Sequence, residues 1–202
     1  MRLVLRYSSL SPFARKVRVF AHEIGLGDRL ELSECDVWAN DSDIIRDNPY
    51  AKVPVLLTDD GTFLGSTLCC EFLDSLHAGE RLVPPGPPAR WPVLQRHALG
   101  DGLMEAAVAH VTEQLRRPSQ YVYQGYLDRQ AAKIQRGLDM LEPQVAAFAA
   151  RTDLASITLA CALGYLDLRL PQLGWRAGRR ALAEWFGIFG ARPSMLATQP
   201  RR

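Results

Sequence analysis

A proline-rich stretch between Gly79 and Pro92 divides this sequence into two halves of different pattern. Proline fixes φ and removes a backbone N–H, so a stretch this rich in proline sustains neither a helix nor a central strand. We therefore predict a linker at residues 79–89, between a first domain at residues 1–78 and a second at residues 90–202. Five of the 13 prolines carry this prediction: Pro84, Pro85, Pro87, Pro88 and Pro92.

The half before the linker alternates between strand and helix patterns. Short apolar runs predict strands, and apolar residues three or four apart predict helices. Asp59-Asp60-Gly61 between two short runs is typical of a hairpin. The predicted order is β-α-β-α-β-β-α, in which the second helix could also be an irregular loop. The segments are residues 3–7, 12–24, 30–32, 41–47, 55–57, 62–64 and 66–76.

The half after the linker has only helical patterns. Helices are predicted at residues 93–115, 121–150, 154–168 and 178–191, and Pro143 should interrupt the second of them. Asp153 is expected to cap the third helix, with Ser156 three residues later. The fold class is therefore an α/β unit followed by an all-α bundle. A chain of 202 residues, 48% of them hydrophobic, suffices for one large domain or two small ones.

The charge balance and the cysteine pattern argue against binding to nucleic acid, to an anionic membrane or to a metal ion. Lysine and arginine total 24 against 22 acidic residues, and a net charge of +2 gives no electrostatic footprint for nucleic acid or an anionic membrane. No apolar run approaches the roughly 18 residues that span a bilayer. The start of the chain lacks a secretory signal pattern, so we expect a cytoplasmic location. The four cysteines show no C-x-x-C pair and no zinc spacing, so we expect reduced thiols and no metal.

The first candidate site is Ser11, between a predicted strand and a predicted helix. Serine followed by Pro12 is a favourable helix cap, and the sequence leaves a plain cap and a functional site equally open. A helix N-terminus presents unpaired N–H groups and a partial positive charge, which stabilise a bound thiolate. Ala14 at the third helical position leaves no capping acid to compete for the site. Arg15 adds to the positive field if its side chain reaches back.

Two further motifs could hold a peptide ligand. Val53 precedes Pro54 directly before a predicted strand, and a cis bond there would expose the N–H and C=O of Val53 to a ligand instead of a neighbouring strand. Ser66 lies at the start of a predicted helix, where it is a good N-cap. Together with the helix N-terminus, Ser66 would also bind a carboxylate. A purely structural role stays open for both motifs.

In their order and spacing, these motifs resemble the glutathione S-transferase family. The N-terminal pattern is Ser11-Pro12-Phe13, then Asn48-Pro49 with Lys52-Val53-Pro54-Val55-Leu56, then Asp60-Gly61 and Ser66. The resemblance covers nearly the whole chain and points to a bacterial cytosolic member with serine at the catalytic position. It implies a thioredoxin-like first domain, a helical second domain and a homodimer. In the second half it rests on Asp101-Gly102, Leu163-Gly164-Tyr165-Leu166-Asp167, Trp175-Arg176-Ala177-Gly178 and Ala191-Arg192-Pro193.

The resemblance implies a role for each motif. Ser11 falls where the family keeps its catalytic serine or cysteine, and it would stabilise the thiolate of glutathione, the co-substrate. Val53 would pair its main chain with the cysteinyl part, Ser66 would hold the γ-glutamyl carboxylate, and Lys52 would meet the glycyl carboxylate. The expected glutathione-binding residues are Phe13, Lys52, Val53, Pro54, Gly65 and Ser66. Those expected to line an apolar pocket for a second, electrophilic substrate are Leu10, Phe13, Met104, Val108, Tyr121 and Tyr126.

One departure from the family pattern leaves alternatives open. The family usually has glutamate or aspartate directly before the Ser66 position, to meet the γ-glutamyl amino group, whereas this sequence has Gly65. The leading prediction is a detoxification enzyme that conjugates glutathione to a small apolar electrophile. The first alternative is a non-catalytic binding or accessory protein with weak affinity for glutathione. The second is a redox or dehalogenating enzyme that acts through Cys69 or Cys70.

Overall fold

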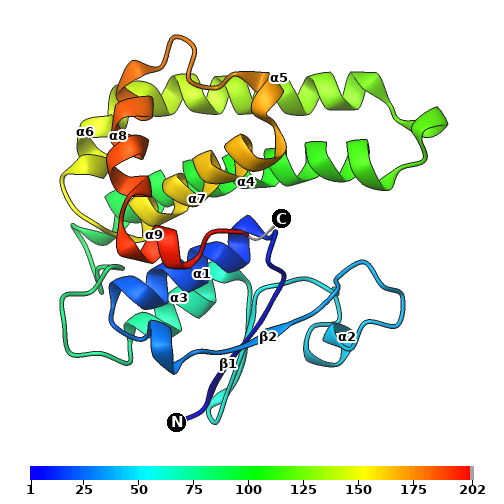
Figure 1. Ribbon diagram of the computed structural model, residues 1–202. Helices are drawn as coiled ribbons and strands as arrows, with labels where there is room; N and C mark the ends of the chain where they lie inside the picture. The colour runs from blue at the N-terminus through cyan, green and yellow to red at the C-terminus, as the bar shows by residue number, and fades with distance from the viewer. Residues whose placement is uncertain (201–202) are drawn as a thin grey trace. The chain divides into compact units, whose positions relative to one another are not determined.

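The computed structural model describes residues 1–200 and divides the chain into two compact units (Figure 1). The first contains Met1–Pro85 together with the segment from Arg192 onward, and the second contains Gly86–Ala191. The division at Pro85 lies inside the predicted linker. The prediction differs from this division at the end of the chain, because it assigned the segment after Ala191 to the helical domain.

A four-stranded sheet forms the centre of the first unit. Its strand order is β2-β1-β3-β4, with β1 and β2 parallel and the other neighbours antiparallel. The strands are β1 (Leu3–Tyr7), β2 (Glu31–Glu34), β3 (Val55–Thr58) and β4 (Gly61–Leu64). The predicted hairpin is confirmed as β3 and β4, and the second strand begins one residue later than predicted.

Helices α1 (Pro12–Glu23) and α3 (Ser66–Asp74) pack against each other beside this sheet (Figure 1). Their buried residues include Val17, Phe20 and Leu73, which supply the apolar face that the periodicity predicted. The remaining helix, α2, is a single turn at Ile44–Asp47, so the first residues of the predicted segment 41–47 are not helical. The predicted β-α-β-α-β-β-α order is confirmed.

The end of the chain returns to the first unit as α9 (Pro193–Ala197), which packs on α1. Glu23, the last residue of α1, accepts hydrogen bonds from Arg192 Nε at 2.8 Å, Arg192 Nη2 at 2.6 Å and the Ser194 hydroxyl. Arg15 Nη2 donates to the Met195 carbonyl at 3.0 Å. These polar contacts explain why the segment belongs to the first unit, and no sequence pattern predicted them.

The connection after α3 is held by one buried carboxylate. Asp74 accepts the backbone N–H groups of Leu82 at 3.1 Å and Val83 at 2.9 Å, and it lies 2.9 Å from His77 Nε2. Asp74 is almost fully buried, so these bonds satisfy a charge that water does not reach. The start of the proline-rich segment is therefore anchored to the first unit.

The second unit consists of helices. They are α4 (Arg90–Arg116), α5 (Gln124–Leu141), α6 (Val145–Ala149), α7 (Leu154–Arg169) and α8 (Arg180–Gly190). A 3₁₀ turn at Glu142–Gln144 interrupts the predicted second helix at Pro143, as expected. Pro92 lies in the first turn of α4, where a backbone N–H has no helical partner, so the proline is tolerated inside the helix.

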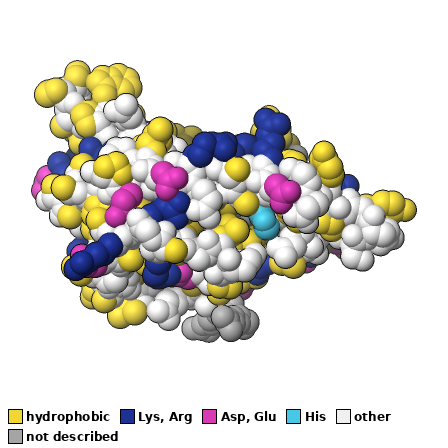
Figure 2. Space-filling view, turned by 90° about the horizontal axis from the view of Figure 1, so that it is seen from above, with side chains coloured by type: hydrophobic (Ala, Val, Ile, Leu, Met, Phe, Trp, Pro, Cys, Tyr) yellow, Lys and Arg dark blue, Asp and Glu magenta, His cyan; other side chains and the backbone are white. Residues whose placement is uncertain are grey.

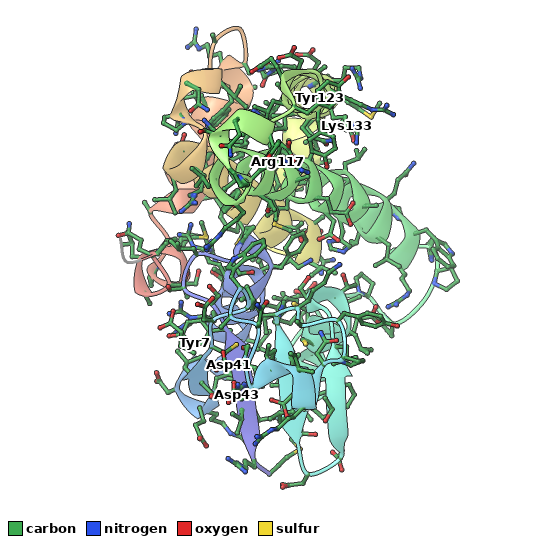
Figure 3. All side chains as sticks on the ribbon, turned by 90° about the vertical axis from the view of Figure 1, so that its right-hand side faces the viewer. Tyr7, Asp41, Asp43, Arg117, Tyr123 and Lys133 are labelled. Atoms are coloured by element: carbon green, nitrogen blue, oxygen red, sulfur yellow. The ribbon has the colours of Figure 1, made fainter. Side chains whose placement is uncertain are left out.

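Helix α4 packs along α5 and α7 in this unit. The predicted cap of α7 is confirmed as a reciprocal pair: Asp153 Oδ1 accepts the Ser156 N–H, and Ser156 Oγ accepts the Asp153 N–H, both at 2.9 Å. Arg96 Nη2 from α4 lies 3.2 Å from Asp153 Oδ2. Near the other end of α4, Glu113 accepts the Tyr123 N–H at 3.0 Å and pairs with Arg117 (Figure 3).

All four cysteines are thiols. Within residues 1–200, no helix is both long and apolar enough to cross a membrane. The same residues contain no group of three or more histidine, cysteine, aspartate or glutamate side chains placed to hold a metal ion. The face shown in Figure 2 carries basic and acidic side chains interspersed with apolar ones, so its charge is mixed in sign.

Candidate functional site

The register of the sheet brings the three sequence motifs to one edge. β1 ends at Tyr7, shortly before Ser11, and its Arg6 lies opposite Val55 at the start of antiparallel β3. Val55 in turn lies opposite Leu64 at the end of β4. The segment before β3 and the glycine after β4 therefore leave the sheet at the edge where β1 ends. This juxtaposition follows from the hairpin and from the antiparallel pairing of β1 with β3.

Ser11 is the N-cap of α1, as predicted. Its N–H donates to the Ser8 carbonyl at 3.0 Å, which closes a turn between β1 and α1. Its Oγ accepts the Ala14 N–H at 3.2 Å. A hydroxyl that accepts one bond still has a proton to donate, so Ser11 can cap the helix and donate to a bound sulfur at once. The cap and the functional alternative are thus compatible.

The Arg15 guanidinium makes a polar contact with the C-terminal segment. Its Nη2 donates to the Met195 carbonyl in α9, and the side chain is buried. This contact does not support the expectation that the Arg15 side chain reaches back toward Ser11. The guanidinium ties α1 to the C-terminal segment instead.

The Val53–Pro54 bond is cis, which is the alternative that the second motif left possible. Asn48 shapes the loop before it: its Nδ2 donates to the Lys52 carbonyl at 2.8 Å and its Oδ1 accepts the Tyr50 N–H at 3.0 Å. The main-chain N–H and C=O of Val53 make no hydrogen bond within residues 1–200. A pair of unused backbone groups beside a strand is what an extended peptide ligand requires.

The third motif has a different cap from the predicted one. Gly65 is the N-cap of α3, and Ser66 is its first helical residue. Gly65 has φ 83° and ψ 147°, a conformation that glycine adopts readily and other residues rarely do. The Gly65 N–H donates to the Pro54 carbonyl at 3.2 Å, so the second and third motifs are in direct contact.

Ser66 directly follows this contact as the first residue of α3. The Ser66 hydroxyl makes no hydrogen bond within residues 1–200. It stands at a helix N-terminus, where backbone N–H groups lack helical acceptors and the helix dipole favours an anion. Ser66 is therefore suited to a carboxylate, although it is not the cap that the sequence predicted.

Both halves of the chain are similar to known proteins of one family. Residues 10–76 match the model for the glutathione S-transferase N-terminal domain, and residues 124–187 match the model for the C-terminal domain. The uncharacterized GST-like protein YibF of Escherichia coli K12 is 33% identical over 204 residues, covering 99% of this chain and 98% of YibF. The chain belongs to the glutathione S-transferase family.

Solved glutathione transferase structures share its fold. A family member from Pseudomonas fluorescens Pf-5, crystallised with bound glutathione, is 39% identical with a TM-score of 0.95, covering 99% of this chain and 100% of that one. A glutathione S-transferase from Methylobacillus flagellatus, also with glutathione bound, is 32% identical with a TM-score of 0.91, covering 98% and 100%. The thioredoxin-like and helical domains predicted from the sequence are those of this transferase fold.

The residues predicted to line a second-substrate pocket are spread over both units of the chain. Leu10 lies exposed in the turn before Ser11, and Phe13 is half-buried on α1. Tyr121 and Tyr126 are exposed in the helical unit, whereas Met104 on α4 is fully buried. Full burial makes Met104 a core residue of this structure. Val108, one turn further along α4, is half-buried.

A hollow of about 670 Å³ lies in the helical unit and contains none of the predicted site residues. Its polar groups are already bonded to the protein. Glu142 accepts the N–H groups of Ala181 at 2.8 Å and Leu182 at 2.9 Å, and Arg179 pairs with Asp139 at 2.7 Å. We assign no chemistry to it. It is lined by Asp139, Glu142, Pro143, Val145, Ala146, Gly178, Arg179 and Ala181.

The cysteines of α3 are poorly suited to act as nucleophiles. Cys69 and Cys70 are fully buried. Burial raises the pKa of the Cys69 thiol to about 12, so the reactive thiolate is scarce at neutral pH. Cys69 Sγ also donates to the Phe63 carbonyl at 3.4 Å. These observations disfavour the alternative in which a cysteine of α3 carries redox or dehalogenating chemistry.

Sequence reasoning missed the role of one residue near the site and missed another residue altogether. Asn48 was part of the family pattern, but its side-chain bonds to the loop before Val53 were not predicted. Glu34, at the end of β2, accepts the Ser9 N–H at 2.9 Å from 25 residues away. No local pattern in a single sequence signals a contact of that kind.

Proposed function

We propose that this protein is a glutathione transferase that binds glutathione at the shared edge of the sheet and stabilises its thiolate with Ser11 and the start of α1. The observation that carries the proposal is the convergence of three groups: a hydroxyl at a helix N-terminus, an unpaired main-chain segment and a second helix N-terminus. The relatives from Pseudomonas fluorescens and Methylobacillus flagellatus, crystallised with glutathione, support this ligand.

Each group suits one part of the tripeptide. Val53 offers an N–H and a C=O without a partner in residues 1–200, which suits main-chain pairing with the cysteinyl residue. Ser66 and the first turn of α3 suit the γ-glutamyl carboxylate. Lys52 is exposed beside Val53, where an ammonium group can meet the glycyl carboxylate. Phe13 and Pro54 flank the same edge of the sheet.

In the proposed reaction, the glutathione thiolate attacks an electrophilic carbon of a small apolar substrate. The thiol proton passes to water, and the sulfur lone pair forms a carbon–sulfur bond. In a substitution, the leaving group departs with the electron pair of its own bond to carbon; in an addition, the π electrons of the conjugated acceptor move to its electron-withdrawing end, which then takes up a proton from water. Ser11 donates a hydrogen bond to the sulfur and does not attack. The N-terminus of α1 carries a partial positive charge that lowers the pKa of the bound thiol. Holding thiolate and electrophile together supplies the remainder of the rate.

Calorimetry with glutathione and a conjugation assay with 1-chloro-2,4-dinitrobenzene test this proposal. Ser11→Ala should keep the fold and bind glutathione, while its turnover falls about tenfold to a hundredfold through loss of one bond to a charged sulfur. Ser11→Thr keeps a hydroxyl and a cap and should retain most activity. Unchanged turnover in Ser11→Ala would remove the hydroxyl from the mechanism.

A second candidate, a non-catalytic glutathione-binding or accessory protein, is favoured by Gly65. The position offers no carboxylate to the γ-glutamyl amino group, so one charge-assisted bond of the usual family pattern is missing. The two functions separate in the same experiments. Binding without turnover for any of a panel of aromatic and alkyl electrophiles would favour the binding protein.

We propose further that the protein is a cytoplasmic homodimer. Leu64 at the end of β4 and Leu68 on α3 are exposed apolar residues of the first unit, and Leu68 has 51% of its surface accessible. Light scattering should give twice the monomer mass, and Leu68→Glu should shift it toward the monomer. The four thiols suit a compartment in which glutathione is kept reduced.

A further inference from the structure

The turn that leads to Ser11 is held from outside by a carboxylate. Glu34 Oε1 accepts the Ser9 N–H at 2.9 Å. Hydrogen bonds from the side chain and the backbone of Ser9 lower the pKa of Glu34 below its usual value of 4.5. Glu34 is therefore ionised at neutral pH, and a bond to an ionised acceptor is stronger than one between neutral groups.

The Ser9 N–H needs such an acceptor because the turn itself does not use it. Ser8 to Ser11 form a four-residue turn closed by the bond from the Ser11 N–H to the Ser8 carbonyl. The bond that closes a turn uses the N–H of its fourth residue, so the Ser9 N–H is left for an acceptor outside the turn. With Glu34, the N–H groups of Ser9 and Ser11 both have protein acceptors.

Glu34 is itself fixed by the sheet. It is the last residue of β2 and lies in register with Tyr7, the last residue of β1. The next residue, Cys35, donates its N–H to the Tyr7 carbonyl at 2.9 Å. The positive charge of Arg18 on α1 acts on Glu34, and the Arg18 guanidinium carbon is 5.3 Å from the centre of the ring of Tyr7, which is labelled in Figure 3. The carboxylate thus links the ends of two strands, the turn and the helix that follows.

We propose that Glu34 is a positioning residue for Ser11, which fixes the Ser8–Ser11 turn and thereby the place of the Ser11 hydroxyl and of the α1 N-terminus. This role rests on the proposed function only in so far as Ser11 stabilises a thiolate. A displacement of about 1 Å in a catalytic group can cost about a hundredfold in rate. The expected loss on removing Glu34 therefore falls on turnover more than on binding.

Three variants isolate the role: Glu34→Ala, Glu34→Gln and the control Glu31→Ala. Glu31 lies in the same strand, its side chain is 63% exposed, and one of its carboxylate oxygens lies 3.7 Å from Arg2 Nη2. Glu34→Ala should lower kcat about tenfold to a hundredfold with little change in the KM for glutathione. Glu34→Gln keeps an acceptor oxygen and should restore most of kcat. Glu31→Ala should match the unmodified protein.

Amide hydrogen exchange, followed by NMR without ligand, gives a readout that is independent of catalysis. Exchange at the Ser9 and Ser11 amides should accelerate about tenfold or more in Glu34→Ala but not in Glu31→Ala, since one bond to a charged acceptor is lost. Unchanged exchange at both amides, or a kcat equal to that of Glu31→Ala, would overturn the positioning role. If the unmodified protein has no activity but Glu34→Ala still accelerates exchange at the Ser11 amide, the proposed function is refuted. The stabilisation of the turn by Glu34 is then still supported.

Discussion

Replacing Gly65 by glutamate should change two quantities in opposite directions: the stability of the protein and its affinity for glutathione. In Gly65→Glu, a β-carbon added to Gly65 meets no atom within 4 Å, so the new side chain has room. The backbone is the obstacle, because φ 83° with ψ 147° lies close to a region that is almost exclusive to glycine. A residue held there costs about 1–3 kcal/mol of stability. For a chain of this length, that corresponds to a fall in Tm of about 2–12 °C.

The Gly65→Glu variant should bind glutathione more tightly. A carboxylate that meets the γ-glutamyl amino group adds a charge-assisted hydrogen bond of about 1.5–3 kcal/mol. This corresponds to a Kd for glutathione lower by about tenfold to a hundredfold. The backbone strain is present with and without ligand, so it cancels from the affinity if Gly65 keeps its conformation. Gly65→Glu should therefore be less stable and bind more tightly.

Calorimetry and thermal unfolding measure the two terms separately. Gly65→Ala is the matched control, because it carries the same backbone cost without the carboxylate. It should show the lower Tm with the affinity of the unmodified protein. A Gly65→Glu variant that binds no more tightly than Gly65→Ala would refute the reasoning about the amino group. An unchanged Tm in both variants would refute the reasoning about the backbone.

Three further outcomes follow from named contacts. Burial would raise the pKa of Glu23, but hydrogen bonds from Arg192 and Ser194 hold it below its usual 4.5. The ionised Glu23 therefore stabilises the fold above about pH 4.5, and this stabilisation is lost as the pH falls through its lowered pKa. In urea unfolding, the loss of stability caused by Glu23→Gln should shrink in acid; a loss that is the same at every pH would contradict this reasoning. Asp153→Ala should lose at least the roughly 0.5–2 kcal/mol of a helix cap in urea unfolding, whereas Asp41→Ala, at an exposed position outside the helices and strands, should lose little. Asn48→Ala should raise the Kd for glutathione in calorimetry and lower Tm by a few degrees, because the side chain is buried and its two bonds shape the loop before Val53.

Elements with a strong local pattern were predictable from the sequence. The strand at residues 3–7 and the hairpin of β3 and β4 depend on neighbouring residues, and both are confirmed. Helix α9 was missed because it has only five residues. The residue that bonds its N-cap Arg192 is Glu23, which lies 169 residues earlier in the sequence. Pro92 was assigned to the interrupted stretch, yet it fits α4 because the first turn needs no N–H there.

The site was predictable in its motifs but not in its supports. Ser11, Val53 and Ser66 stand out through the residues beside them, and the antiparallel pairing of β3 explains why they share one edge of the sheet. The cap of α3 was assigned to Ser66 because serine is the commoner cap, whereas the positive φ of Gly65 is a property of the folded backbone. Glu34 and Asn48 act through contacts that only the folded chain creates.

A crystal structure of the protein grown in excess glutathione tests the central claim most directly. The account predicts a tripeptide whose cysteinyl main chain pairs with Val53, whose γ-glutamyl carboxylate meets Ser66, and whose sulfur lies within hydrogen-bonding distance of Ser11 Oγ. Glutathione bound elsewhere, or bound at this edge with its sulfur turned away from Ser11, would contradict it.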